Sequence, residues 1–353
     1  MGRIKTKGVF MLHEILELQK KIVPELVETL EKRYNVLRTI YYNQPIGRRV
    51  LANELKIGER VVRNEVSFLN SQGLIEINTP GMTVTEDGER IINKLKDFIH
   101  EIKGLSELEE EVRSSLNLKK VIIVPGDLDN NPSILKDLGK ACAHYVKDVL
   151  VNNDIIALTG GSTLKAVVEQ FPKINNLSNI QVVPARGGVG KNVETQANTL
   201  AASLAKKLNG SYKMLHVSEN LSLDVLDTLL KEEEIKAVVD TLHKADILMY
   251  GIGNAVQMAK KRGVSEAKIK KLIDNGAVGE AFGCYFTKSS QIISEATSIG
   301  IKISEARKIR THIAIAGGKN KVESIISTEF NDINGILVTD EETGKKILET
   351  LNR

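Results

Sequence analysis

The chain has only two cysteines, Cys142 and Cys284, and it has no apolar run long enough to span a membrane. The cysteines lie far apart and belong to no Cys-x-x-Cys or Cys/His pattern, so we expect buried free thiols in a reducing cytosol. The six histidines are scattered, and we expect no metal site. The first residues contain no long apolar segment with a cleavage site, which argues against secretion. These absences favour a cytoplasmic protein.

The length of 353 residues suggests about two domains, and the two halves of the chain differ in pattern. Residues 10–100 look helical, with one short hairpin near the end. From about residue 119 onward, apolar runs alternate with helical patterns. We therefore expect a first domain over 1–90, a charged linker helix over 91–117 and a second domain over 118–353.

The second domain is predicted to be a doubly wound α/β fold of the Rossmann-like kind. Short continuous apolar runs separated by helices are typical of a parallel sheet that is buried on both faces. The sequence contains seven such runs: VIIVPGD, DIIALTGG, NIQVVPARGG, YKMLHVSE, ADILMYGIG, HIAIAGG and GILVTDE.

The positive charge of the chain is concentrated near its N-terminal end. Residues 32–63 hold eight basic and only two acidic residues, an excess of six, whereas the whole chain has a net charge of +4. A compact basic region in an otherwise balanced protein indicates a polyanionic partner.

The same region has the order of elements of a winged helix-turn-helix. The segment RRVLANEL predicts a short helix, Lys56-Ile57-Gly58 a turn, and the following residues a second helix to about Asn70. Gly73 ends that helix, and LIEI and GMTV predict two strands that turn at Pro80-Gly81. Helix, turn, helix and two-stranded ribbon together predict a DNA-binding domain.

The second helix carries a polar stripe that is suited to base contacts. Arg60, Arg63, Asn64 and Ser67 fall at i, i+3, i+4 and i+7, so they share one face of the helix. Arg pairs with guanine and Asn with adenine in the major groove. We assign phosphate contacts to Arg48 and Arg49, at the start of the preceding helix. A solvated charged face is the alternative, and the coincidence of turn, wing and charge argues against it.

A turn in the second domain, Thr-Gly-Gly-Ser-Thr at 159–163, is suited to holding a phosphate. It joins an apolar strand to a helical pattern, and a helix N-terminus has unpaired N–H groups and partial positive charge. The turn is neither a Walker loop nor a dinucleotide-binding loop. An ordinary strand-to-helix turn remains the alternative for these five residues alone.

Further loops at strand ends carry glycine with charged side chains. In an open α/β sheet the ligand sits at the carboxyl ends of the strands, so these loops converge. Their positive charge exceeds what one phosphate needs, which indicates two phosphates or a bisphosphate. The loops are VVPARGGVG with Arg186, YGIGNAVQMAKKRGV with Lys260, Lys261 and Arg262, NGAVGEAFGCYF with Glu280, and IAGGKNKVESI with Lys319 and Lys321.

Taken together, the winged helix and the motifs TGGST, PARGGVG, TQAN, GIG and AGGKNK resemble the SorC/DeoR-type sugar-sensing bacterial transcription regulators. The resemblance covers nearly the whole chain. It implies a sugar-phosphate isomerase-like effector domain, and a homo-oligomer, dimer or tetramer, on operator double-stranded DNA. Within the family, the likeness is to repressors of triose-phosphate operons whose inducer is fructose 1,6-bisphosphate.

The resemblance also implies which residues bind the effector. Lys261 stands where the family usually has Arg, and Lys319 is an alternative to Lys321 for the last contact. One phosphate would be held by Gly160, Gly161, Ser162 and Thr163, and the remaining contacts would come from Arg186, Gln196, Lys261, Arg262, Glu280 and Lys321.

The main alternative function is a sugar-phosphate isomerase or deaminase fused to a DNA-binding module. Deaminases of this fold resemble G-I-G-x-D-G-H at the GIG loop, but this chain has Ala255 and Gln257 in the places of the Asp and the His. Neither side chain can act as a general acid or base. A nucleotide-binding scaffold would need a dinucleotide loop, which is missing. We therefore expect a sensor without enzymatic activity or cofactor.

Overall fold

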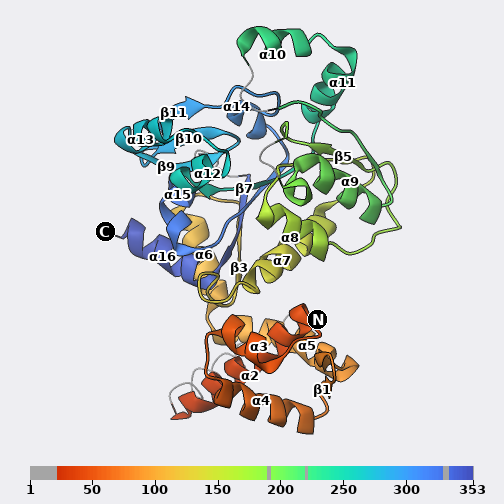
Figure 1. The fold of residues 1–353 in the computed structure, drawn as a ribbon, viewed down its shortest axis with the longest axis vertical. Coiled ribbons are helices and arrows are strands. Elements are labelled where there is room, and N and C mark those ends of the chain that lie inside the picture. The colour runs from red at the N-terminus through yellow and green to blue at the C-terminus, as the bar shows by residue number, and fades with distance from the viewer. Residues whose placement is uncertain (1–21, 189–191, 219–221, 329–333, 353) are drawn as a thin grey trace, which may run out of the picture. The chain divides into compact units, whose positions relative to one another are not determined.

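The computed structural model describes residues 22–188, 192–218, 222–328 and 334–352 (Figure 1). Residues 12–21, the expected start of the first helix, and Val189 and Gly190 of the loop with Arg186 lie outside these residues. The described chain forms two compact units. Unit one comprises Met1–Leu108 and Pro125–Ile134, and unit two comprises Glu109–Val124 and Leu135–Arg353.

Unit one has the predicted winged helix-turn-helix. Ile46 pairs with Met82 of the ribbon through two backbone hydrogen bonds of 3.2 and 2.8 Å, so the wing has a third, one-residue strand. Its core contains the fully buried side chains of Leu51, Val62 and Val66. Val62 and Val66 lie between residues of the polar stripe in the sequence. The elements are α2 (Pro24–Asn43), α3 (Arg48–Leu55), α4 (Glu59–Ser71), β1 (Ile75–Asn78), β2 (Gly81–Val84) and α5 (Glu86–Ile102).

The expected single linker helix is divided into two helices. Helix α5 ends at Ile102, Gly104 has a φ of 61°, and α6 then runs over Leu105–Ser115. The middle of α6 is tied to strand β3 (Lys120–Val124), because Glu109 accepts a hydrogen bond of 2.7 Å from the backbone N–H of Ile123. The side chain of Val112 is fully buried. Periodicity and charge continue across residues 103–104, which is why the sequence did not reveal the break.

Unit two is built on a seven-stranded parallel sheet, and all seven predicted runs contribute to it. The strand order is β3-β13-β12-β7-β4-β5-β6, and every pair in it is parallel. The run YKMLHVSE contributes least, because only its Tyr212, with Ser211 before it, is in a strand. The strands are β3 (Lys120–Val124), β4 (Ile155–Leu158), β5 (Gln181–Pro184), β6 (Ser211–Tyr212), β7 (Ile247–Gly251), β12 (Thr311–Ile315) and β13 (Gly335–Asp340).

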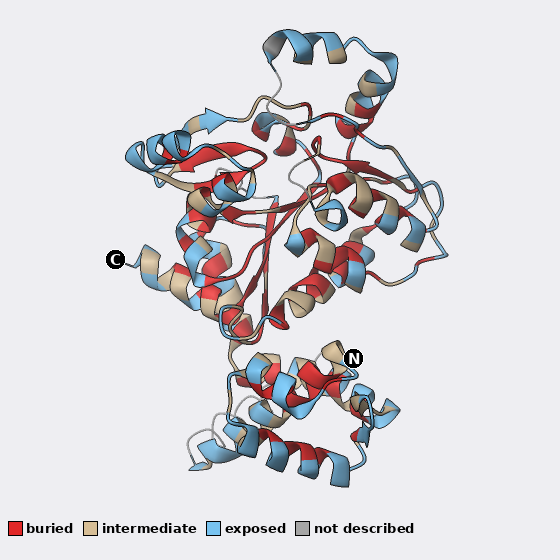
Figure 2. Ribbon diagram, viewed as in Figure 1, coloured by how far each residue is buried: buried red, intermediate tan, exposed pale blue. Residues whose placement is uncertain are grey.

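Helices cover both faces of this sheet, as a doubly wound fold requires. Figure 1 shows α7, α8 and α9 on one face and α15 and α16 on the other. Figure 2 shows that the strands are largely buried, apart from the short, exposed β6, and that the exposed residues of the covering helices lie on their outer sides. The helices are α7 (Ile134–Val149), α8 (Ser162–Gln170), α9 (Ala197–Lys207), α10 (Leu223–Leu229), α11 (Glu233–Leu242), α12 (Ala255–Lys261), α13 (Glu266–Asp274), α14 (Ile303–Ala306), α15 (Val322–Ile326) and α16 (Glu341–Leu351), with short 3₁₀ turns at Val193–Thr195 and Lys319–Lys321.

A second, antiparallel sheet is inserted between β7 and β12, where the sequence suggested only a glycine-rich loop. Its strands are β8 (Gly253–Asn254), β9 (Ala277–Ala281), β10 (Cys284–Thr287) and β11 (Ile292–Glu295). A two-residue turn joins β9 to β10, with φ values of 52° at Phe282 and 77° at Gly283. Two-residue hairpin turns usually have the sequence Asn-Gly or Asp-Gly. The sequence of this turn is Phe-Gly, so the hairpin could not be predicted from it.

Both cysteines are buried free thiols, as expected. Burial raises the pKa of the Cys142 thiol far above its usual value. Burial, and then the nearby Glu295, raise the pKa of Cys284 to about 12. In the described part of the chain, no helix is long and apolar enough to cross a membrane.

Candidate functional site

The polar stripe of α4 lies on the surface of unit one. Arg60, Arg63, Asn64 and Ser67 are all exposed, whereas Val62, Val66 and Leu69 on the opposite side are buried. The residues at the start of α3, Arg48 and Arg49, are exposed as well. The structure therefore presents all six predicted DNA-contacting residues to solvent.

Half of the basic residues counted in the sequence have structural roles instead. Arg38 is 1% exposed and lies over the ring of Tyr34, 5.3 Å from its centroid. Lys56 donates to the carbonyl of Asp129 at 2.8 Å. With Lys32 and Arg33, described next, four of the eight basic residues are engaged in this way. The exposed arginines that remain for a polyanion are Arg48, Arg49, Arg60 and Arg63, of which Arg49 lies 3.6 Å from the exposed Glu59.

Lys32 and Arg33 are held by one carboxylate on the inner side of α4. Their nitrogens lie 2.7 and 3.1 Å from the carboxylate oxygens of Glu65, whose side chain is 11% exposed. Arg33 also stacks on Phe68, 3.6 Å from the ring centroid. Burial raises the pKa of Glu65, but hydrogen bonds from Lys32 and Arg33 outweigh it, and the net pKa is lowered. This pairing fixes α4 against α2.

The candidate effector site lies where the strand order of the large sheet reverses. Strands β4 and β7 are neighbours, but the chain leaves β4 towards β5 and leaves β7 towards β12 on the other side. Loops after the two strands therefore diverge at their carboxyl ends. In open α/β folds this position is the crevice in which ligands bind, and we refer to it here as the crevice. The loop after β4 is the Gly160–Thr163 turn, and the loop after β7 is Gly251–Gly253.

The turn after β4 has the geometry of an anion cradle. Gly161 has a φ of 123°, which side chains rarely adopt, and its N–H donates to the carbonyl of Thr195 at 2.8 Å. Helix α8 begins at Ser162, and no side chain caps it. The N–H groups of Ser162, Thr163 and Leu164 have no hydrogen-bond acceptor among the described residues, as expected for a first helical turn. Gly161 thus shapes the cradle, and the three residues after it supply the donors.

Gln196 lies between the cradle and the loop after β5. A Cβ at Gly160 would stand 2.6 Å from the Thr195 carbonyl oxygen and 3.7 Å from the carbonyl carbon of Gln196. A Cβ at Gly188 would stand 3.1 Å from Oε1 of Gln196. Lys165, one turn into α8, pairs with Glu194 beside this loop. This ion pair could not be predicted from local patterns, because Lys165 and Glu194 are 29 residues apart in the chain.

Arg186 is buried at the end of β5, with 5% of its surface exposed. Its Nη2 donates to Ser298, and its backbone forms a bridge with Gly300. A Cβ at Gly283 would overlap its guanidinium group. Ser298 was not recognised in the sequence, since a lone serine in a loop carries no signal.

Glu280 and Arg262 form a buried ion pair. Nη2 of Arg262 lies 2.8 Å from Oε1 of Glu280, and the side chains are 9% and 4% exposed. The same oxygen accepts a hydrogen bond of 2.6 Å from the N–H of Gly283. Lys261 is exposed at the end of α12, so the structure pairs Glu280 with Arg262 rather than with Lys261. Arg262, Glu280, Gly283 and Arg186 form one connected group.

The loop after β12 contributes the last two candidate cations. Nζ of Lys319 lies 3.5 Å from Glu342, whereas Lys321 is half-buried at the start of α15. The loop is anchored to α16, because the N–H of Gly318 donates to Asp340 and Thr343 at 3.1 and 2.9 Å. Lys321 therefore stays the predicted ligand contact, with Lys319 as the alternative.

The positions that carry acid and base groups in deaminases of this fold are unsuited to that role here. Ala255 is buried at the start of α12, and Gln257 is exposed. Asn254 caps the helix, its side chain accepting a hydrogen bond of 3.2 Å from the N–H of Gln257. The nearby carboxylate, Glu280, is engaged by Arg262 and Gly283.

Comparison with known proteins places both units in described families. The "CggR N-terminal DNA binding domain" matches residues 29–99, and the "Putative sugar-binding domain" matches residues 100–349. The central glycolytic genes regulator of Bacillus subtilis (strain 168) is 39% identical over 337 residues, which are 96% of this chain and 99% of that protein. The protein of the same name in Priestia megaterium is 36% identical and is covered over its full length, with 97% of this chain.

A solved structure agrees with the fold of unit two. The chain described as "the putative SorC family transcriptional regulator from Enterococcus faecalis" superposes with a TM-score of 0.64 at 32% identity. The match covers 69% of this chain and 99% of that one. The overall fold of this part of the chain is thus shared with a regulator of known structure.

Proposed function

Since the chain belongs to the family of sugar-binding transcriptional regulators that includes the central glycolytic genes regulators, we propose that it represses glycolytic triose-phosphate genes under the control of fructose 1,6-bisphosphate. Unit one binds operator double-stranded DNA in the cytoplasm, and unit two binds the effector. The protein acts as a homo-oligomer, a dimer or a tetramer, so that the α4 helices of two subunits reach a two-part operator.

The observation that carries the proposal is positive charge on separate loops around the crevice, which we infer to form two anion-binding ends. One end is the first turn of α8, where the N–H groups of Ser162 to Leu164 have no hydrogen-bond acceptor among the described residues. The helix dipole also favours negative charge at this end. The other end consists of basic side chains from three other loops, Arg186, Arg262 and Lys321. A ligand with a phosphate at each end of a short carbon chain satisfies both, which favours a bisphosphate over a monophosphate.

The polar side chains between the two ends suit the hydroxyl groups of a sugar. Glu280 uses Oε1 for Arg262 and Gly283, and its other oxygen can accept a bond from a hydroxyl. Gln196 lies beside the cradle, within reach of a neighbouring hydroxyl. Buried groups that are already oriented by protein contacts give specificity at small entropic cost.

We propose a sensor rather than an isomerase or deaminase fused to a DNA-binding module. Ala255 and Gln257 leave the crevice without the acid–base pair of such enzymes, and Glu280 is already engaged as an acceptor. The relatives are named as regulators, in keeping with this choice.

A panel of sugar phosphates tests the proposal. Fructose 1,6-bisphosphate is expected to raise the unfolding temperature more than fructose 6-phosphate or glucose 6-phosphate does, because only it fills both anion-binding ends. The same samples, analysed for new sugar phosphates after incubation, are expected to contain the added compound unchanged. Equal shifts with the monophosphates would contradict the bisphosphate, and protein-dependent product would contradict the sensor.

A further inference from the structure

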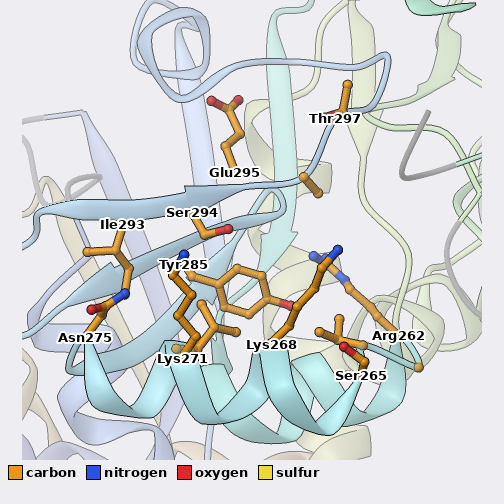
Figure 3. A pocket seen from close by; sticks show the side chains of 14 residues that line it. Arg262, Ser265, Lys268, Lys271, Asn275, Tyr285, Ile293, Ser294, Glu295 and Thr297 are labelled. Carbon is orange, nitrogen blue, oxygen red and sulfur yellow. The ribbon is translucent and has the colours of Figure 1, made fainter. Parts of the chain in front are cut away.

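Unit two contains a pocket of about 620 Å³ between α13 and the strands β10 and β11 (Figure 3). The cradle, Arg186, Gln196, Glu280 and Lys321 are not among its lining residues. Arg262 is the one residue that it shares with the effector site. The pocket is therefore a separate space beside the crevice.

The pocket is lined by cations. Lys268 and Lys271 are one turn apart on α13, and Figure 3 shows them rising from the helix on either side of the Tyr285 ring. In the described part of the chain, neither lysine has an ion-pair or hydrogen-bond partner. Arg262 enters from the preceding loop, and Figure 3 shows its guanidinium pointing to the same side of the ring as Lys268.

Glu295 is the one carboxylate among the residues that line the pocket, and strand alternation turns its side chain away from the lysines. Tyr285 pairs with Ser294, and Cys284 pairs with Glu295, so Ser294 shares the face of Tyr285 and Glu295 shares that of Cys284. Figure 3 accordingly shows the Glu295 carboxylate pointing away from the lysines. Arg262 is balanced by Glu280. The two positive charges of Lys268 and Lys271 remain uncompensated.

Two like charges one turn apart destabilise a helix unless an anion lies between them. A phosphate monoester carries close to two negative charges at neutral pH and accepts several charge-assisted hydrogen bonds. Ser265, at the N-cap of α13, makes no capping bond, so its hydroxyl is available as a further donor. The volume exceeds that of a phosphate group, and Leu272 and Ile293 add apolar lining suited to a small carbon skeleton.

We propose that this pocket binds a phosphate monoester of a small metabolite, with Lys268, Lys271 and Ser265 holding the phosphoryl group. Arg262 links it to the effector site, because any ligand that draws the guanidinium towards the pocket weakens its bond to Glu280. Coupling through Arg262 rests on the proposed function of the crevice, whereas binding in the pocket does not. By linkage, each ligand would change the affinity of the other by the same factor.

Inorganic phosphate, titrated into the full-length protein at constant ionic strength, tests the site. The chain has seven tyrosines, so labelling with 3-fluorotyrosine gives a fluorine spectrum in which Tyr285→Phe identifies the signal of Tyr285. We expect that signal to shift saturably with phosphate. The double variant Lys268→Gln/Lys271→Gln should weaken binding by roughly tenfold or more, the loss expected for two charge-assisted contacts.

Two controls distinguish phosphate binding in this pocket from a general effect of positive charge and from phosphate binding in the crevice. Lys260→Gln/Lys270→Gln removes the same charge from exposed positions outside the pocket and should leave the titration unchanged. Arg186→Ala impairs the crevice and should also leave it unchanged. The proposal is overturned if the Tyr285 signal does not saturate, if its shift survives the loss of Lys268 and Lys271, or if Arg186→Ala removes it.

Discussion

Gly283 leaves open the space that the guanidinium group of Arg186 fills, and a Cβ at that position would overlap its nitrogens. The two residues belong to different loops, one after β5 and one in the β9–β10 turn. Their contact places a buried cation against the group formed by Glu280 and Arg262. The orientation of Arg186 therefore depends on the absence of a side chain on a neighbouring hairpin.

Replacing Gly283 by Ala should displace Arg186 and greatly weaken the response to fructose 1,6-bisphosphate. Gly276→Ala is a matched control, because Gly276 has a similar φ, 74° against 77°, but open space around it. Both variants should lose about 1–2 kcal/mol of stability to backbone strain. Thermal shifts with ligand should separate them, and an equal ligand response in the two would contradict the role of the overlap.

Arg186→Ala should leave the protein folded but remove most of its stabilisation by effector. Ligand that binds only the folded state, at a hundredfold excess over its Kd, stabilises by about 2.7 kcal/mol, and this gain should largely vanish. Ser298→Ala should reduce it partially, since Ser298 only positions the guanidinium. Calorimetric titration measures both, and full binding by Arg186→Ala would remove that residue from the site.

The two sets of arginines in unit one should differ in their effect on DNA. Arg63→Ala should cost about 1–3 kcal/mol on the operator and relax base preference, because its side chain is on the exposed stripe of α4. Arg48→Ala should weaken binding to all sequences alike and lower the salt slope by about one. Binding isotherms over a salt series measure both, and an unchanged preference in Arg63→Ala would place α4 outside the groove.

Glu65 should make the stability of unit one depend on acidity. Its pKa is lowered in the folded state, so its contribution is present above the unfolded pKa of about 4.3 and is lost as the pH falls through the folded value. Glu65→Gln should cost about 1–2 kcal/mol at pH 7, and the difference should shrink below about pH 4. Hydrogen exchange of the α4 amides, corrected for intrinsic rates, measures this effect. Glu54→Gln on α3 is the control, and a difference that persists in acid would contradict the pairing.

Helix α6 should be needed for the stability of an isolated effector-binding fragment. A fragment from Leu105 keeps Val112 and Leu116, which are 0% and 5% exposed, whereas one from Leu118 lacks them. Losing two buried side chains should cost about 3–6 kcal/mol. Urea unfolding compares the fragments, and equal stabilities would show that α6 belongs to the linker, as the sequence suggested.

The parts of the fold whose sequences have a regular hydrophobic pattern were predictable. The seven apolar runs and the helix-turn-helix come from local patterns, and loops after β4, β5, β7 and β12 could be grouped by the rule for carboxyl ends of strands. The antiparallel insertion was missed, since its strands are short and the Phe282-Gly283 turn has no usual turn signal.

The sequence predicts a set of candidate site residues but not the contacts that each of them makes in the fold. Only the fold reveals that Arg262 pairs with Glu280 while Lys261 is exposed, or that the N–H of Gly161 is taken by Thr195. The burial of Arg38 in unit one could not be predicted either. A charged residue in a helix is expected to be exposed unless its neighbours in the fold are known.

The reversal of strand order between β4 and β7 divides the large sheet into two halves. One half consists of β4, β5 and β6, and the other of β7, β12 and β13 with β3 at its edge. Backbone hydrogen bonds along a single strand boundary join them, from Ile156 to Thr159 on one side and Ile247 to Met249 on the other. A ligand held by loops from both halves would act there as a reversible cross-link. Effector binding would then raise the force or the thermal energy needed to separate the halves, and the effector-binding unit would unfold more cooperatively with its ligand than without it.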